Sequence, residues 1–445
     1  MNVDEIRQTL DRLAAAAQAG DEELFRRLLE TSKLAIRDYL MSIELEGTPP
    51  GFTARYVGDA LQRFLHTLQL VPLPAGGRIL ELGGNPYFFH ILLRRLFPGS
   101  TVQAGNFFDH NIFSGEVGSA THHLRSGPFA EEWTFTYPLF NLEVVPRYPF
   151  PAASFDLIFF CETLEHLVVN PLPVFRKIRR LLAPGGHLVI SLPNALRLTN
   201  LACMLDGYNY FDLYHPDTGV HGRHNREFTL AEMKRLLELH GFVVRRAETR
   251  DRFDYDEVPI VAVDYSGEPV ILDRRRQELQ KILQTTGGTL EDRGDNLYLL
   301  AQRVSPPGPP PLGTPAPQQE RGIVACPPPP PPDPARAPAF VDTLQDGASR
   351  LVVIGWAFLS DEWGGESDWI KLVLRSADRC YSVACSRRTR PDVANIYGLD
   401  REDPGFEVTI DKAALPAGRY RLGVLLGGPG LREGFHDLGI ETVAG

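Results

Sequence analysis

Apolar residues recur at helical spacing through the first part of the chain. The stretches EELFRRLLETSKLAIRDYLM and ARYVGDALQRFLHTL place hydrophobic side chains three and four positions apart, with charged residues between them. This spacing puts the apolar side chains on one face of a helix. We therefore expect amphipathic helices here, and residues 1–50 are predicted to form an N-terminal helical segment.

From Arg78 onward, short apolar runs alternate with helical periods. Runs such as RILELG, FDLIFFC, HLVISLP and NLYLLAQR predict strands, while PLPVFRKIRRLL and LAEMKRLLELHG predict helices between them. This alternation is typical of an open, mostly parallel sheet with helices on both faces, the α/β architecture of Rossmann-like folds. We assign it to residues 51–304 and expect ligands at the carboxyl ends of the strands.

A proline-rich segment separates this region from the end of the chain. Residues 305–338 read SPPGPPPLGTPAPQQERGIVACPPPPPPDPARAP. Proline fixes φ and lacks an amide hydrogen, so we expect an extended linker. Residues 339–445 then show short apolar stretches, such as RLVVIGWAFL and GRYRLGVLLGG, bounded by Gly, Pro and Asp. This pattern predicts a small all-β sandwich domain.

Charge and hydropathy exclude several kinds of partner. The 445 residues carry a formal net charge of -10, which gives no general attraction to nucleic-acid phosphates or anionic lipid. No apolar run has the length of a membrane-spanning helix, and the N-terminus lacks the apolar core of a secretion signal. We therefore expect a soluble cytoplasmic protein without a membrane span.

The five cysteines are scattered along the chain and form no CxxC pair. This pattern favours reduced thiols over a disulfide framework or a zinc site. Cys380 and Cys385 are near enough in sequence to pair, but most cytosolic thiols stay reduced.

The turn after the first predicted strand is the candidate nucleotide site. In RILELGGNPYFFHILLRRLFPG, the strand ends at Glu81 and is followed by Gly83 and Gly84, but later glycines are missing. We expect Asn85 to cap the next helix and Pro86 to be its first residue, because both residue types suit those positions. Without later glycines the turn suits a nucleoside better than the pyrophosphate of a dinucleotide.

Four segments resemble the class I S-adenosylmethionine-dependent methyltransferases over roughly Gly51 to Arg303. In order they are ILELGG, SFDLIFFCETLEHL, LLAPGGHLVISLPN and HNREFTLAEMKRLLELHGF. The resemblance implies bound S-adenosylmethionine. The family binds the ribose with an acidic residue near the end of the second strand, where this chain has Asn106, and Asn141 matches a polar residue that contacts the adenine. The implied cofactor-binding residues are Glu81, Gly83, Gly84, Asn85, Asn106 and Asn141. The alternative is that they only shape turns in a fold without cofactor.

The segment CETLEHL holds a cluster of ionisable residues. If the chain is helical there, Glu162, Glu165 and His166 fall on one face, at positions i, i+3 and i+4. Two carboxylates beside an imidazole favour a divalent cation as counter-charge. The alternative is that Glu162 contacts the cofactor or a backbone amide, while Glu165 and His166 stabilise the loop.

A later histidine completes the candidate metal site. Glu162, Glu165 and His166 followed by the distant His224 are similar to the small-RNA 2′-O-methyltransferase family, where two glutamates and two histidines hold magnesium. Ubiquinone-biosynthesis O-methyltransferases have a similar Glu-x-x-Glu-His. The resemblance implies that Mg2+ or another divalent cation binds adjacent substrate hydroxyls and lowers the acceptor's pKa. The rival mechanism needs no metal and uses His224 or His221 as general base. The candidate catalytic residues are His166, His221 and His224.

Two further resemblances concern the acceptor. SLPNALRLTNLACMLDGYNYFDLY and GRHNREFTLAEMKRLLELHGF resemble bacterial methyltransferases associated with cell-surface polysaccharide synthesis. RPDVANIYG and DPGFEVTID resemble a β-sandwich module attached to glycosyltransferases of that pathway. They imply an O-methyltransferase acting on a saccharide or glycosylated precursor, with a glycan or protein partner for the β domain. The alternatives are an RNA 2′-O-methyltransferase, which the acidic charge disfavours, and a non-catalytic scaffold with a degenerate methyltransferase domain.

Overall fold

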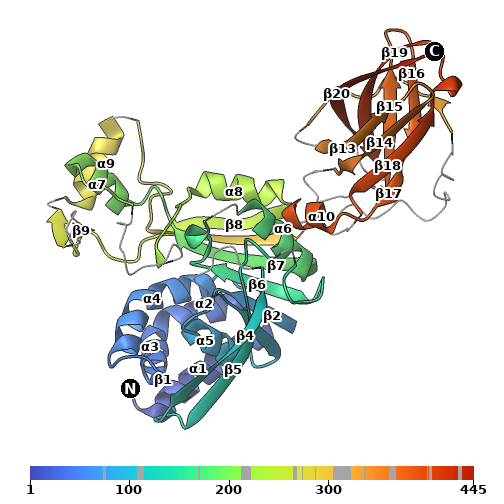
Figure 1. The fold of residues 1–445 in the computed structure, drawn as a ribbon. Helices are drawn as coiled ribbons and strands as arrows, with labels where there is room; N and C mark the ends of the chain where they lie inside the picture. Colours follow the sequence, from blue (N-terminus) through green and yellow to red (C-terminus); the bar gives the residue numbers. More distant parts are fainter. Residues whose placement is uncertain are drawn as a thin grey trace. The chain divides into compact units, whose positions relative to one another are not determined.

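The chain is divided into two compact units in a computed structural model (Figure 1). One unit comprises Met1–Glu238 with Phe242–Arg303, and the other comprises Val304–Gly445 with Leu239–Gly241. No helix in the described residues is long and apolar enough to cross a membrane. The structure describes residues 1–73, 77–107, 115–145, 147–168, 171–211, 222–263, 268–272, 274–285, 287–303, 322–334, 337–359, 367–397, 399, 403–428 and 433–445.

The first unit begins with helices, as the hydrophobic pattern predicts. The first helix starts in a capping box, in which the Asn2 side chain accepts from the Glu5 amide and the Glu5 carboxylate accepts from the Asn2 amide. The apolar faces of these helices share one core with the central sheet, so residues 1–50 pack as part of this unit. The elements are α1 (Val3–Ala19), α2 (Glu22–Thr31), α3 (Lys33–Met41), β1 (Ile43–Leu45) and α4 (Phe52–Leu68).

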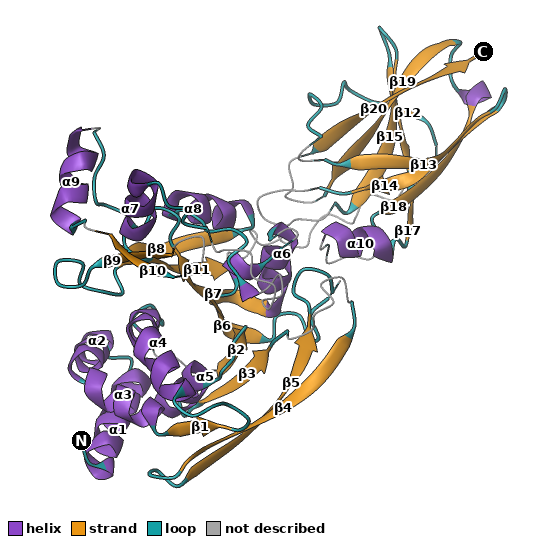
Figure 2. Ribbon diagram, turned by 60° about the vertical axis from the view of Figure 1, so that its left-hand side comes forward, coloured by secondary structure: helices purple, strands orange, loops and turns teal. Residues whose placement is uncertain are grey.

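The centre of this unit is a six-stranded sheet in the order β3-β2-β6-β7-β11-β8. All neighbouring pairs are parallel except those of β11, which is antiparallel to both β7 and β8. The mostly parallel α/β fold is therefore confirmed (Figure 2). The strands are β2 (Gly77–Leu82), β3 (Ser100–Gly105), β6 (Phe155–Cys161), β7 (Leu182–Pro193), β8 (Phe242–Arg250) and β11 (Asn296–Arg303).

Helices cover both faces of this sheet. Successive side chains of a strand point to opposite faces, so Phe159 joins the core shared with the N-terminal helices and Phe160 joins the core on the other face. Both faces are buried, which explains why these strands are continuous apolar runs. The remaining helices against the sheet are α5 (Phe88–Leu96), α6 (Leu172–Leu181) and α8 (Leu230–Leu239).

Two insertions extend the first unit. One is a long hairpin that pairs with β1 and bridges to Asn106 just after β3. The other is a small lobe with its own apolar core (Figures 1 and 2). The hairpin consists of β4 (Val117–Ser126) and β5 (Glu131–Phe140), and the lobe of α7 (Leu198–Asp206), β9 (Ile260–Val263), β10 (Pro269–Leu272) and α9 (Arg276–Thr285).

The second unit is the expected all-β sandwich. Sheets of order β12-β16-β15-β19-β20 and β13-β14-β18-β17 enclose one core, and all of their pairings are antiparallel. Part of the predicted linker belongs to it, because Val324 and Ala325 pair with β16. The elements are β12 (Val324–Ala325), β13 (Ala339–Asp346), β14 (Arg350–Ala357), β15 (Trp369–Arg375), β16 (Cys380–Ala384), β17 (Ser386–Arg388), α10 (Pro391–Tyr397), β18 (Gly405–Asp411), β19 (Gly418–Gly427) and β20 (Gly434–Ala444).

Cys326 and Cys380 are expected to form a disulfide when the protein is treated with oxidised glutathione. Their sulfur atoms lie 3.0 Å apart, and the Cys326 amide donates to the Cys380 carbonyl at 2.9 Å. Thiol–disulfide exchange would join the two sulfurs and release reduced glutathione. Peptide mapping without reductant should find this crosslink, and Cys326→Ser should abolish it. A crosslink through Cys385, which is buried, would contradict the prediction.

Candidate functional site

A hollow lies at the carboxyl ends of the central strands, where the fold class predicts a ligand. Its wall is formed by α4, the turn after β2 and the ends of β6 and β7, and we call it the β2 hollow. The residues that line it are Tyr56, Arg63, Phe64, Thr67, Glu81, Gly83, Gly84, Asn85, Pro86, Tyr87, Phe88, Phe89, Cys161, Glu162 and Ser191.

Glu81 is a buried carboxyl group in the wall of the β2 hollow. Its Oε2 lies 3.0 Å from His90 Nδ1, and both side chains are almost fully buried. Burial raises the pKa of Glu81, and the hydrogen bond from His90 opposes this shift. His90 comes from the middle of an apolar helix, and no sequence motif identified it as a site residue.

Neither of the two predicted glycines has room for a side chain. Gly83 has a φ of 82°, in the left-handed region that favours glycine, and an added Cβ would lie 2.1 Å from Thr163 Oγ1. At Gly84 an added Cβ would lie 2.6 Å from the Glu81 carboxyl group. Side chains at these positions would therefore displace groups beside or within the hollow.

The predicted helix cap at Asn85 and Pro86 is wrong. Helix α5 begins at Phe88, and its N-cap is Tyr87, with a φ of 71°. The Tyr87 amide donates to the Gly84 carbonyl at 2.7 Å, and its ring is fully buried. Burial of the Tyr87 ring sets the start of the helix, because burying an aromatic side chain stabilises the fold more than a polar N-cap would. Asn85 and Pro86 remain in the wall of the hollow.

Asn106 and Asn141 are not among the described residues that line the β2 hollow. Asn106 follows β3 as predicted, but its Nδ2 donates to Tyr87 Oη at 3.3 Å and its Oδ1 accepts from the Phe107 amide at 2.9 Å. Asn141 Oδ1 accepts from the Glu143 amide at 2.9 Å, which stabilises the turn after β5. Their cofactor contacts stay predictions, and the contacts seen here shape the backbone.

Glu162 does not share a helical face with Glu165 and His166, which corrects the prediction. Its φ is 47°, and only a 3-10 turn, Leu164–His166, follows it. The Glu162 carboxylate accepts from Arg63 Nη1 at 2.9 Å, from Ser191 Oγ at 2.9 Å and from Asn296 Nδ2 at 3.1 and 3.2 Å. These contacts hold the carboxylate at the β2 hollow, and Arg63, from α4, was missed in the sequence.

Replacing Arg63 with alanine is expected to lower the free energy of unfolding by about 1–3 kcal/mol, because it leaves the half-buried Glu162 carboxylate without its counter-charge. Arg26→Ala is the matched control. Arg26 pairs with Glu22 on an exposed helix surface, so its loss is expected to cost less than about 1 kcal/mol. Urea denaturation of both variants tests this difference, and equal losses would contradict a stabilising role of the half-buried ion pair.

Glu165 and His166, in the turn after β6, form a compact group with His224 from the segment before α8. One ligand atom from each lies within 4.8 Å of the others. The Glu165 side chain is 1% exposed, and its Oε2 has no hydrogen-bond partner among the described residues. The rings of His166 and His224 are 5.1 Å apart, edge to face. The structure thus brings together three of the four predicted ligands and leaves Glu162 with Arg63. His221 lies outside the described residues.

Both histidines are oriented through Nδ1. His166 Nδ1 lies 2.9 Å from the Arg223 carbonyl, and His224 Nδ1 lies 2.9 Å from Glu227 Oε1. Asn225 fixes the segment by donating its Nδ2 to the His166 carbonyl at 2.9 Å. Carbonyl and carboxylate oxygens accept, so the neutral form of each imidazole has its proton on Nδ1 and its lone pair on Nε2. Glu227 was not recognised in the sequence.

The donor set of this group suits a divalent cation. Burial, and then the negative charge of Glu162, raise the pKa of Glu165 well above its ordinary value. A carboxyl oxygen buried without a partner is costly, and a cation would satisfy it. Histidine ligands commonly donate their other ring N–H to a carboxylate or carbonyl, as both do here. The three residues therefore fit a metal.

The comparisons identify the class of protein. Residues 52–247 match the family model of a methyltransferase domain. The chain thus contains a methyltransferase domain, and the prediction of a methyltransferase is confirmed. No curated protein matches the sequence.

The fold is similar to several solved structures. A Haloferax volcanii protein described as a methyltransferase, in complex with the Trm112 activator, is 14% identical, with a TM-score of 0.34 over 62% of this chain and 98% of that chain. A Mesorhizobium loti S-adenosylmethionine-dependent methyltransferase is 17% identical, with a TM-score of 0.31 over 55% and 98%. Phosphoethanolamine N-methyltransferase 2 of Haemonchus contortus, in complex with S-adenosyl-L-methionine, is 15% identical, with a TM-score of 0.31 over 61% and 60%.

Proposed function

We propose that this protein is an S-adenosylmethionine-dependent O-methyltransferase that acts on a hydroxyl group of a saccharide or glycosylated precursor in the cytoplasm. The observation that supports it best is the group of Glu165, His166 and His224. Glu165 and His166 follow the same strand, β6, whose end places Glu162 in the wall of the β2 hollow, and His224 joins them from the segment before α8. A site for a methyl donor thus lies next to side chains that can activate a hydroxyl group.

The β2 hollow is the proposed cofactor site. Gly83 and Gly84 would allow the cofactor to approach the backbone, and Glu81 and Glu162 offer carboxyl groups on its wall. When bound, S-adenosylmethionine supplies a methyl group activated by its sulfonium. The chain's own contribution is to hold the donor and, through Arg63 on α4, to close the hollow on one side.

The three-residue group is the proposed site of hydroxyl activation. Glu165, His166 and His224 would hold a divalent cation, which lowers the pKa of a hydroxyl bound to it. Attack of the hydroxyl oxygen on the methyl carbon would break the carbon–sulfur bond, yield S-adenosylhomocysteine and pass the hydroxyl proton to solvent. Without a cation, His224 would accept that proton as general base.

The acceptor class rests on the sequence resemblances and on charge. The formal charge of -10 gives no attraction to a polyanion, which disfavours RNA. A glycan or protein partner of the all-β unit also remains our proposal. A scaffold with a degenerate methyltransferase domain would give the same match over residues 52–247, so binding of the methyl donor decides between the two.

The test is transfer of a radiolabelled methyl group from S-adenosylmethionine to a panel of saccharides and to RNA, with magnesium or with EDTA. We expect label in a saccharide fraction, and less in EDTA. Label in RNA, together with a gel shift that weakens steeply with salt, would replace the saccharide proposal. Transfer to saccharide that is unchanged by EDTA would retain the enzyme and remove the metal.

A further inference from the structure

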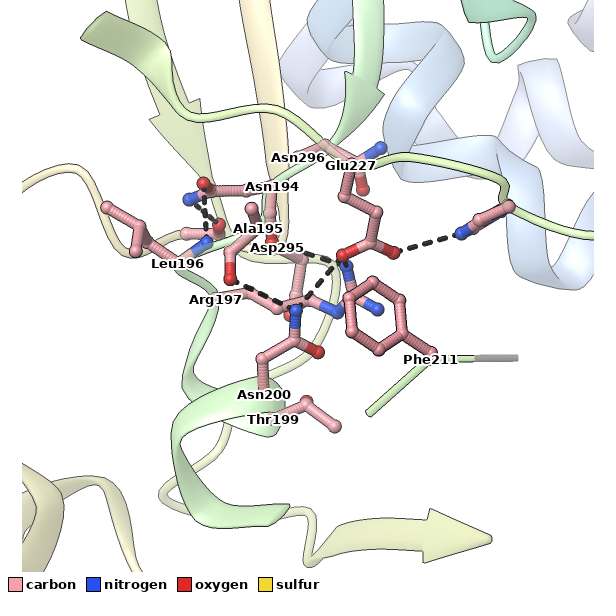
Figure 3. Close-up of polar contacts among 12 residues, drawn as sticks. Asn194, Ala195, Leu196, Arg197, Thr199, Asn200, Phe211, Glu227, Asp295 and Asn296 are labelled. Carbon is pink, nitrogen blue, oxygen red and sulfur yellow. Dashed lines mark hydrogen bonds and ion pairs between the residues drawn. The ribbon is translucent and has the colours of Figure 1, made fainter. Parts of the chain in front are cut away.

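Glu227 lies at the centre of a polar network beside the three-residue group (Figure 3). Its Oε1 is 2.9 Å from His224 Nδ1, while its Oε2 accepts from Arg197 Nη1 at 2.6 Å and from Asn200 Nδ2 at 3.0 Å. The Glu227 side chain is only 6% exposed. Burial alone would raise the pKa of Glu227, but the hydrogen bonds from His224 and Arg197 hold it below its ordinary value.

The donors to Glu227 are fixed to the segment that follows β7. Arg197 Nη1 also donates to the Asn194 carbonyl at 3.2 Å, and Asn200 Nδ2 also donates to the Ala195 carbonyl at 3.1 Å. These bonds leave Arg197 and Asn200 little freedom to follow a movement of Glu227.

Asn194 in turn ties this segment to the sheet. Its side chain is buried, and its Nδ2 donates to the Asp292 carbonyl at 2.9 Å and to the Gly294 carbonyl at 2.7 Å, just before β11. Its Oδ1 accepts from the Leu196 amide at 3.0 Å. Figure 3 shows this chain of contacts from the strand end to Glu227. Glu227 is therefore tied, through Arg197, Asn200 and Asn194, to the segments that follow β7 and precede β11.

We propose that Glu227 is a positioning residue that fixes the ring of His224 in the tautomer with its lone pair on Nε2, the form that binds a divalent cation. The proposal rests on the metal-assisted function proposed above. Replacing a carboxylate that orients a metal-binding histidine typically lowers the affinity for the metal by about 10–100-fold. The competing possibility is that Glu227 only closes the loop through its ion pair with Arg197.

The isosteric Glu227→Gln variant separates these two possibilities. Glutamine has one acceptor oxygen, which Arg197 and Asn200 both require, so its NH2 group would face His224. His224 Nδ1 would then have to accept, and its proton would move to Nε2, which removes the lone pair available to a cation. A purely structural role predicts no such change, because the glutamine oxygen still binds Arg197.

The experiment is a titration of the full chain with Mn2+, followed by electron paramagnetic resonance, without cofactor or acceptor. We expect Glu227→Gln to raise the dissociation constant at least about tenfold. Glu232→Gln is the control, because Glu232 contacts Arg226 on the exposed side of the same segment, and it should bind like the wild type. Equal affinity in wild type and Glu227→Gln, both folded by circular dichroism, would overturn the proposal.

A second readout does not depend on metal. Nitrogen-15 spectra of the imidazole rings in the metal-free protein should show His224 protonated on Nδ1 in the wild type and on Nε2 in Glu227→Gln. The same tautomer in both proteins would overturn the positioning role. If the wild type binds no Mn2+ but the tautomer changes as expected, the metal-assisted mechanism is wrong. Glu227 then still positions His224, which would act as a general base.

Discussion

Gly83→Ala is expected to weaken binding of S-adenosylhomocysteine, the product of the proposed cofactor, by about 5- to 100-fold. Alanine would be strained at a φ of 82°, and its Cβ would lie 2.1 Å from Thr163 Oγ1, so the turn must shift. A backbone strained in this way costs about 1–3 kcal/mol, and each 1.4 kcal/mol changes affinity about tenfold. Isothermal titration calorimetry measures the effect.

Gly99→Ala is the matched control for this substitution. Gly99 follows α5 at the far end of that helix, and an added Cβ would meet nothing within 4 Å. We expect this variant to bind S-adenosylhomocysteine as the wild type does. If Gly83→Ala is folded and binds as tightly as Gly99→Ala, the β2 hollow is not the cofactor site.

Glu165→Ala is expected to lower kcat/KM by about 100-fold or more, since it removes the buried carboxyl group from the proposed cation site. The loss corresponds to about 2.7 kcal/mol of transition-state stabilisation, within the several kcal/mol that a metal ion can supply. The same variant should lose Mn2+ binding. Steady-state kinetics and Mn2+ titration measure the two effects separately.

Asp156→Asn is the control for the loss of a carboxylate near Glu165 in the sequence. Asp156 lies at the amino end of β6, where it pairs with Arg78 at the surface. This variant should keep both activity and Mn2+ binding. Full activity of Glu165→Ala, in EDTA as well as in magnesium, would contradict the metal-assisted mechanism.

The central fold follows from the sequence because its parallel strands are buried on both faces. FDLIFFC and HLVISLP are continuous apolar runs, which are typical of strands in a parallel sheet with both faces buried. The hairpin strand β4 is different. Its sequence, VGSATHHLRS, is polar, and its residues are mostly exposed. Its pairing with β1 joins residues far apart in the sequence, such as Ile43 and Ser126, which no local pattern indicates.

The candidate site was predictable only where its residues are adjacent in sequence or match a motif. Glu165, His166 and His224 were found in this way. Their partners were not, because Arg63, His90 and Glu227 lie in helices or loops where such residues are usually solvated. Only the fold brings these three side chains next to the carboxylates and histidine that they contact.

The two incorrect predictions, a helix cap at Asn85 and a helical face that includes Glu162, have a common physical cause. Asn85 and Glu162 were placed by helix propensity and helical spacing. In the structure Tyr87 enters the left-handed region so that its ring can be buried, and Glu162 does so while its carboxylate bonds Arg63, Ser191 and Asn296. Long-range contacts thus override local preference at both turns, as is common at functional sites.

The measurement that tests the central claim most directly is a calorimetric titration of S-adenosylhomocysteine into the full chain. We predict saturable binding with one site per chain and a dissociation constant in the micromolar range, which corresponds to a binding free energy of about -8 kcal/mol. Absence of binding by the folded protein at high concentration would contradict the proposed cofactor site and favour a scaffold whose methyltransferase domain no longer binds a methyl donor.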